Sequence, residues 1–436
     1  MEPVTVGLIG LAGMFLLIAL HVPIGIAMAF AGVAGVAWLV GFSPAMALFS
    51  IEAASAIANE NLAIIAIFLL MGSFANAAGL SRDLYQLAYA IIGHRPGGLS
   101  TATILGCAGF GAVCGSSVAT TAAMTKMALP EMQKRGYSLQ LASGSIASGG
   151  TLGILIPPSV IMVLYGVLTE QFVIALFSAA VIPGLVAVAL YVMAIEVQVR
   201  LVPNSGPAGE RLTWPERIQV FKASWRILLV AAAVSGGIYS GIFTVTEAAS
   251  LGASLALIMA LMARQLTWGS FVDCLLEAAG STCMIFVILI GASIFSYFIS
   301  LSGAPDALVE VIRGMGLAPL VVILLLMIMY VILGSVFDTV AAMVITLPFV
   351  LPLVTEIGFD PIWWGVMMVM VMEVGMITPP IGINVFVLQG AAAERLPLAT
   401  IYRGVAPFVA VDLVRLAIIA LFPPLALWLP GVIGWL

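Results

Sequence analysis

The fold is decided by a short polar interruption in apolar sequence, Cys114-Gly115-Ser116-Ser117-Val118-Ala119-Thr120-Thr121. A similar stretch, Gly334-Ser335-Val336-Phe337-Asp338-Thr339-Val340, follows about 219 positions later, which places Gly115 over Gly334. A second pair of similar segments comes next in the same order, Gly153-Ile154-Leu155-Ile156-Pro157-Pro158 and Gly375-Met376-Ile377-Thr378-Pro379-Pro380. Two matches in one order indicate one ancestral unit that is present twice.

The composition is that of a polytopic membrane protein. Of 436 residues, 63% are hydrophobic and only 8% are charged, whereas a soluble domain carries roughly a quarter charged residues. The 15 Lys and Arg residues form no basic face, which excludes nucleic acid as a partner. The two His residues and the four Cys residues, which lack metal-ligand spacing, predict no enzyme centre, no metal cluster and no cofactor.

The first apolar stretch, from Val4 to Leu20, is expected to be a permanent span. It lacks a basic start and an Ala-x-Ala cleavage site, and a second apolar run over 22–40 follows directly. The tight junction at Pro23 leaves two interpretations open, either two spans or one long kinked helix.

The segment 97–134 is too long for one span and carries the Gly-Ser-Ser interruption in its middle. Positive charges flank both ends, with Arg95 before it and Lys134 and Arg135 at its end. Because positive charge marks the cytoplasmic side, both ends are expected there. The segment is therefore predicted to enter the membrane, turn, and leave by the same side as a re-entrant helical hairpin.

The second hairpin is predicted to enter from the opposite side, since only Glu356 and Asp360 flank it. The predicted fold class is an all-α polytopic membrane protein with two inverted-topology repeats, each with one re-entrant hairpin and one broken helix. The expected parts are N-terminal scaffold helices 1–61, repeat 62–199 with hairpin 97–134, a cytoplasmic linker 200–226, scaffold helices 227–264, and repeat 271–430 with hairpin 317–354.

Each repeat also contains a helix that is expected to break inside the membrane. In the first repeat, helical hydrogen bonding is predicted to fail at Ser148-Gly149-Gly150-Thr151 and again at Pro157-Pro158. Unpaired N–H and C=O groups cost several kcal/mol each in a bilayer. That cost is offset if the carbonyls coordinate ions and the N–H groups hold an anion, as in transporters built on discontinuous helices. The interruptions therefore predict ion and substrate sites where hairpin tips meet broken helices.

Four segments of the chain resemble the large membrane subunit of tripartite ATP-independent periplasmic (TRAP) transporters. They are Cys107 to Thr120, Ala128-Leu129-Pro130-Glu131-Met132, Arg135-Gly136-Tyr137 and Ile377-Thr378-Pro379-Pro380-Ile381-Gly382, and the likeness covers nearly the whole chain. The resemblance implies an elevator-type secondary transporter, with a scaffold and a transport domain, driven by a Na⁺ gradient in the bacterial inner membrane. It also implies two partners besides the lipid bilayer: a small four-helix membrane subunit, expected as a separate polypeptide, and a periplasmic binding protein that delivers an organic acid.

Carried onto this sequence, the resemblance and the internal symmetry imply two Na⁺ sites. The substrate is expected between the hairpin tips, near Ser117, Thr121, Pro157 and Pro379. The first Na⁺ site is expected from Gly115, Ser116, Ser117, Thr120, Gly149, Gly150 and Thr151, and the second from Gly334, Ser335, Asp338, Thr339, Gly375 and Thr378.

Other interpretations remain open for single residues. A Ser or Thr in an apolar helix often forms a hydrogen bond with the backbone of its own helix. For any one hydroxyl this interpretation has the same weight as coordination of Na⁺. Asp338 is the strongest candidate, because an ionisable group at mid-membrane is costly, although a structural Asp is the alternative. Glu373 is divided between an ion site and a helix–helix contact. Lys126 is expected to extend to the cytoplasmic interface, and Asp412 is expected to pair with Arg415.

Glu277 and Glu247 are expected near membrane edges. Among other function classes, an intramembrane aspartyl protease lacks a second facing Asp, and channel re-entrant loops normally line a pore by oligomeric symmetry. The closest rival is a stand-alone Na⁺-coupled dicarboxylate carrier of the same two-hairpin architecture, which works without a binding protein. A scaffold without flux is the remaining alternative.

Overall fold

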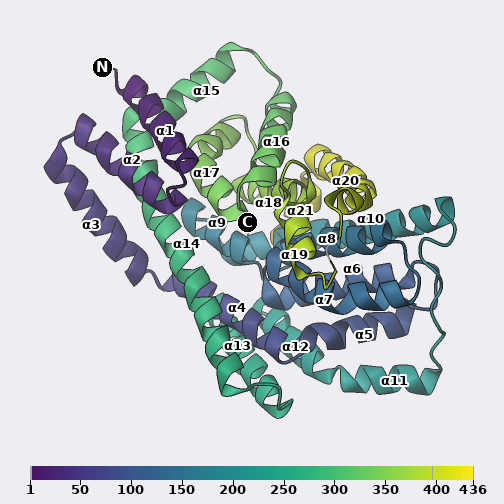
Figure 1. Cartoon of the computed structure of the whole chain (residues 1–436). Helices are drawn as coiled ribbons and strands as arrows, with labels where there is room; N and C mark the ends of the chain where they lie inside the picture. The colour runs from purple at the N-terminus through teal and green to yellow at the C-terminus, as the bar shows by residue number, and fades with distance from the viewer. Residues whose placement is uncertain (1, 395, 436) are drawn as a thin grey trace.

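The computed structural model describes residues 2–394 and 396–435, and within them the chain is helical without strands (Figure 1). Of the described residues, seven helices are long and apolar enough to cross a bilayer, or up to nine if two bent pairs each count as one span. The chain is therefore an all-α protein with the helices of a polytopic membrane protein.

The first half of the chain starts with two separate helices rather than one kinked helix. Pro23 precedes the second helix and caps its start without a side-chain hydrogen bond. The helices of this half are α1 (Pro3–Ala19), α2 (Ile24–Leu39), α3 (Phe42–Ala58), α4 (Glu60–Ala77), α5 (Leu80–Ile92), α6 (Gly98–Cys114), α7 (Ser117–Lys134), α8 (Leu139–Leu155), α9 (Val160–Thr169) and α10 (Val173–Leu201).

A short helix, α11 (Trp214–Ala223), lies in the polar segment between the halves. Its start is fixed by a capping box in which Thr213 and Glu216 satisfy each other's backbone N–H groups. The second half comprises α12 (Trp225–Tyr239), α13 (Val245–Met262), α14 (Trp268–Ser302), α15 (Ala304–Gly314), α16 (Pro319–Val336), α17 (Thr339–Glu356), α18 (Pro361–Ile377), α19 (Ile383–Ala391), α20 (Leu398–Leu421) and α21 (Pro424–Ile433).

An ion pair joins the start of the second half to the surface helix α5. Arg226 Nη2 lies 2.7 Å from Asp83 Oδ2. Burial raises the pKa of Asp83, and the charge of Arg226 opposes this rise. The contact therefore places the start of α12 beside the start of α5.

The helices of the two halves correspond pair by pair at one constant offset in the numbering. α7 and α17 begin at 117 and 339 and end at 134 and 356, and α8 and α18 begin at 139 and 361 and end at 155 and 377. Apart from α11 and α21, the other helices follow the same offset within a few positions, with α3 and α4 together matching the long helix α14. The internal repeat thus extends from α1–α10 to α12–α20, well beyond the two stretches that reveal it in the sequence.

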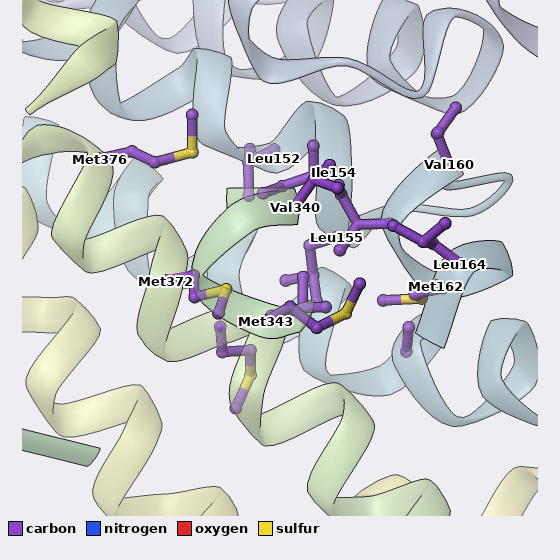
Figure 2. Close-up of a cluster of buried hydrophobic side chains, with 14 of the residues drawn as sticks. Leu152, Ile154, Leu155, Val160, Met162, Leu164, Val340, Met343, Met372 and Met376 are labelled. Carbon is purple, nitrogen blue, oxygen red and sulfur yellow. The ribbon is translucent and has the colours of Figure 1, made fainter. Parts of the chain in front are cut away.

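The two halves share one apolar core directly behind the helix interruptions (Figure 2). Leu152 and Ile154 at the end of α8 meet Val340 and Met343 from the start of α17. Met372 closes the cluster from α18. Methionine is unbranched and flexible, so it fills the irregular spaces that short helix ends leave.

The prediction of a break at Ser148–Thr151 is wrong, because α8 is continuous there. The glycines serve packing instead: a Cβ at Gly150 would lie 1.9 Å from the Thr121 hydroxyl, and one at Gly149 would lie 3.0 Å from the Cys107 sulfur. The first broken helix is interrupted only between α8 and α9, where the Pro157–Pro158 pair lies. The second is interrupted between α18 and α19, at Pro379–Pro380.

Candidate functional site

The first tip is the turn between α6 and α7. Gly115 ends α6 with φ of +65°, a conformation that favours glycine. Ser116 is the N-cap of α7, and its hydroxyl accepts the N–H of Ala119 at 3.3 Å. Ser117, the first residue of α7, is buried. The sequence Gly-Ser-Ser therefore ends one helix and starts the next within two residues.

The second tip has the same construction from different residues. Asp338 is the N-cap of α17, and its Oδ2 accepts the N–H of Val340 at 3.0 Å. Thr339 is the buried first residue of this helix. By helix position Asp338 therefore corresponds to Ser116, and Thr339 corresponds to Ser117.

The predicted alignment of the tips, with Gly115 over Gly334 and Ser116 over Ser335, is consequently wrong by nearly one turn of helix. Gly334 and Ser335 are not at the turn; both are buried in the last turn of α16. Gly334 allows α16 and α18 to cross closely, since a Cβ on Gly375 would lie 2.7 Å from the Gly334 carbonyl carbon. The Ser335 hydroxyl bonds back to the carbonyl of Ile332 at 2.7 Å.

Each tip lies against the interruption of its own repeat. At the first, a Cβ on Gly115 would be 3.2 Å from the carbonyl oxygen of Pro158. At the second, the Gly382 N–H donates to the Ser335 carbonyl at 3.0 Å. The predicted partnership of each hairpin with its own broken helix is therefore present as direct backbone contact.

The two tips meet in one cavity of about 370 Å³. Ser116 and Ser117 line it from the first tip, and Asp338 and Thr339 from the second. The starts of α7 and α17 lie at this cavity, and helix starts carry about half a positive charge. The cavity thus combines hydroxyls, carboxylates and two helix starts, which offers oxygen ligands to a cation and N–H groups to an anion.

Met376 joins the tips inside the cavity. Its sulfur lies 3.5 Å from the Ser117 hydroxyl and 3.4 Å from the Thr339 hydroxyl. A thioether is a weak acceptor, so neither hydroxyl is committed to a strong hydrogen bond here. Both hydroxyl oxygens therefore remain available to a ligand.

Four polar residues of the cavity were missed as site residues by the sequence analysis. Ser73 and Asn76 come from α4, and Glu277 and Ser281 from α14. The Ser73 hydroxyl donates to Glu277 at 3.2 Å. Glu277 was expected only at a membrane edge; its place within the long apolar helix α14 was the signal that could have marked it.

Several predicted site residues do not line the cavity. Thr121, Pro157 and Pro379 are absent from its described lining. The Thr120 hydroxyl bonds to the carbonyl of Ser116 at 2.7 Å, and that of Thr378 bonds to the carbonyl of Val374. Among the described residues, no three His, Cys, Asp or Glu side chains form a metal cluster.

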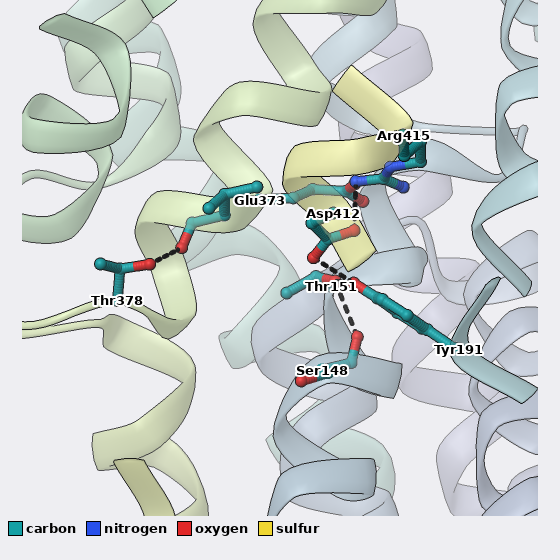
Figure 3. A network of polar contacts seen from close by, with 8 residues as sticks. Ser148, Thr151, Tyr191, Glu373, Thr378, Asp412 and Arg415 are labelled. Atoms are coloured by element: carbon teal, nitrogen blue, oxygen red, sulfur yellow. Dashed lines mark hydrogen bonds and ion pairs between the residues drawn. The ribbon is translucent and has the colours of Figure 1, made fainter. Parts of the chain in front are cut away.

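Thr151 belongs to a buried polar network outside the cavity (Figure 3). Its hydroxyl lies 3.4 Å from that of Tyr191, which donates to Asp412 at 2.7 Å. Arg415 lies 3.0 Å from Asp412 and 3.0 Å from Glu373, and all three charged side chains are inaccessible to solvent. The predicted pair of Asp412 and Arg415 is confirmed, and Glu373 makes the helix–helix contact.

Similarity to known proteins covers nearly the whole chain. Residues 11–425 match the family described as tripartite ATP-independent periplasmic transporter, DctM component. The chain is 35% identical to the C4-dicarboxylate TRAP transporter large permease protein DctM of Pseudomonas aeruginosa, over 92% of this chain and 94% of that protein. It is 31% identical to the 2,3-diketo-L-gulonate TRAP transporter large permease protein YiaN of Escherichia coli, over 95% and 96% of the two chains. The solved YdaH transporter of Alcanivorax borkumensis has the same fold, with a TM-score of 0.63 at 14% identity over 91% of this chain and 90% of that one.

Proposed function

This chain belongs to the DctM family of tripartite ATP-independent periplasmic transporters and is a multi-pass large permease component of the bacterial inner membrane, and from that premise we propose that it imports an organic acid at the expense of a Na⁺ gradient. The observation that carries the proposal is that both tips line the same cavity.

Sodium coupling is supported by the chemistry of the tips. Na⁺ is a hard cation that prefers oxygen ligands, as other hard cations do. Ser116 and Ser117 supply hydroxyls at one tip, and Asp338 and Thr339 supply a carboxylate and a hydroxyl at the other. We assign one Na⁺ to each tip, with carbonyl groups of the adjoining interruptions completing each site.

An anionic substrate is supported by the two helix starts. The N-termini of α7 and α17 place partial positive charge at the cavity. A bound Na⁺ at each tip would add full positive charge beside them. The relatives are named for a C4-dicarboxylate and for 2,3-diketo-L-gulonate, so we propose an organic acid without choosing one.

Inverted topology and elevator motion are supported by the internal repeat and by charge. Arg95, Lys134 and Arg135 flank the first hairpin, whereas Glu356 and Asp360 flank the second. Positive charge on one hairpin only favours entry from opposite membrane faces. Each hairpin packs mostly on its own broken helix, while α14 packs mostly on α2 and α4, and this grouping supports a transport part that moves against a scaffold (Figure 1).

We further propose two partners, a small membrane subunit and a periplasmic binding protein. The family name itself describes a tripartite, periplasmic system, which supports a requirement for both. The closest rival remains a stand-alone Na⁺-coupled carrier of related architecture.

Uptake into proteoliposomes tests the proposal. A radiolabelled organic acid should accumulate only with an inward Na⁺ gradient, the small subunit and the substrate-loaded binding protein. Equal uptake without the binding protein would favour the stand-alone carrier. Uptake that ignores the Na⁺ gradient would refute the coupling.

A further inference from the structure

A second polar cavity, lined by none of the residues that line the cavity at the tips, lies between the surface helix α5 and the first hairpin. Its volume is about 540 Å³. Arg82 and Tyr85 line it from α5, Lys126 and Glu131 from α7, and Arg135 from the end of α7. Three cations thus face one carboxylate in a space large enough for a polar head group.

The cations of this cavity are largely free to bind an anion. Among the described residues, neither Arg82 nor Lys126 forms an ion pair. The carboxylate of Glu131 is instead paired with Lys134, at 3.4 Å. Arg135 stacks over the ring of Tyr89, with its guanidinium carbon 5.0 Å from the ring centre. Stacking orients the guanidinium while leaving its N–H donors available.

A buried hydroxyl also lacks a partner here. Tyr85 is only 6% exposed, and its hydroxyl has no hydrogen-bond partner in the described structure. A buried unsatisfied hydroxyl costs free energy unless something pairs with it. Because Tyr85 lines the cavity, a ligand with acceptor oxygens would satisfy its hydroxyl together with the cations.

The other half of the repeat carries none of these side chains. At the offset that places α7 over α17, the positions that correspond to Arg82, Tyr85, Lys126 and Arg135 are Ala304, Ala307, Pro348 and Ile357. The second half therefore lacks this basic group. Its surface helix α15 packs mainly on α17, whereas α5 packs mainly on α6.

We propose that this cavity binds the phosphate of an anionic phospholipid head group. Lipid rather than a dissolved anion is indicated by the place of the cavity. α5 is an amphipathic helix beside the first hairpin, which the proposed function places in the membrane, and Met127 and Pro130 add apolar lining to the charges. Basic pockets of this kind on the cytoplasmic side suit anionic head groups. The bound lipid holds α5 against the first hairpin.

Binding to the purified protein tests the proposal. The protein, stripped of lipid in detergent, is titrated with phosphatidylglycerol, with phosphatidylcholine and with inorganic phosphate, and saturation is followed by native mass spectrometry and by thermal unfolding. Phosphatidylglycerol should bind saturably and raise the unfolding temperature. The double substitution Arg82→Gln and Lys126→Gln should weaken the binding of phosphatidylglycerol about thirtyfold. Each cation near an anionic lipid contributes about 1 kcal/mol, and about 2 kcal/mol corresponds to about thirtyfold in affinity.

Tyr85→Phe removes only the hydroxyl and should weaken binding about threefold to tenfold. Lys222→Gln, an exposed cation on α11 outside the cavity, should leave binding unchanged. The proposal is overturned if phosphatidylcholine binds as tightly as phosphatidylglycerol. It is also overturned if phosphatidylglycerol binds equally tightly to the wild-type protein and to the Tyr85→Phe variant. Saturable binding of inorganic phosphate without that of phosphatidylglycerol also overturns it, in favour of a free-anion site.

Discussion

Replacing Asp338 with Asn separates its charge from its role as a helix cap. The carboxylate accepts the Val340 N–H at 3.0 Å, and the amide oxygen of Asn caps a helix equally well. The substitution therefore keeps α17 in place while removing the one carboxylate at the two tips. An interaction with a charged group contributes about 1.5–3 kcal/mol, and 1.4 kcal/mol is tenfold in affinity. The Na⁺ concentration for half-maximal uptake should rise about 10- to 100-fold.

The assay is initial uptake in proteoliposomes as Na⁺ replaces choline at constant ionic strength, with saturating substrate-loaded binding protein. Asp360→Asn is the matched control, because Asp360 caps α18 through a 2.7 Å bond to the Ile362 N–H and lies outside the cavity. It should leave the Na⁺ dependence unchanged. If Asp338→Asn also leaves the half-saturating Na⁺ concentration within about twofold of wild type, the assignment of this tip to Na⁺ is refuted.

Four further changes have defined outcomes. Ser117→Ala should raise the half-saturating Na⁺ concentration about threefold to tenfold, since a neutral hydroxyl contributes less than a carboxylate; unchanged Na⁺ dependence would contradict this. Gly375→Ala should lower the free energy of unfolding by about 1–3 kcal/mol, because its Cβ would meet the backbone of α16, whereas Gly236→Ala, with open space around it, should not. Arg415→Met should cost about 3–5 kcal/mol in thermal unfolding by leaving two buried carboxylates without a cation, and a loss below about 1 kcal/mol would show that they are not ionised. Cys at Asn204, which is exposed in the linker, should react with an impermeant maleimide only from the cytoplasm; labelling from the periplasm would reverse the topology.

The sequence predicts a helix interruption well where the backbone properties of the residues themselves end the helix. A Pro-Pro pair removes backbone donors, so the ends of α8 and α18 follow from Pro157 and Pro379. A Gly followed by a capping Ser predicts the first turn in the same way. Glycine pairs inside a helix are different, because they also serve close packing. Gly149 and Gly150 therefore lie in a continuous helix, which only the neighbouring side chains reveal.

The second tip shows that an internal alignment based on residue identity can place residues wrongly. Gly334 and Ser335 have the same residue types as Gly115 and Ser116, but they lie in the last turn of α16. The N-cap of α17 is Asp338. Ser and Asp serve equally well as N-caps, so the two repeats share the position of the capping residue and differ in the residue type. Contacts between distant segments were likewise beyond the sequence: Glu277 faces the first tip from α14, and Glu373 is paired with Arg415 from α20.

The most direct test of the account is a high-resolution map of the complete transporter in a lipid nanodisc, determined once in Na⁺ and once in choline. We predict cation density at both tips in Na⁺, beside Ser116 and Ser117 and beside Asp338 and Thr339, and its loss in choline, with the two tips sharing one cavity at mid-membrane. Tips at opposite membrane surfaces, or identical maps in the two salts, would contradict the account.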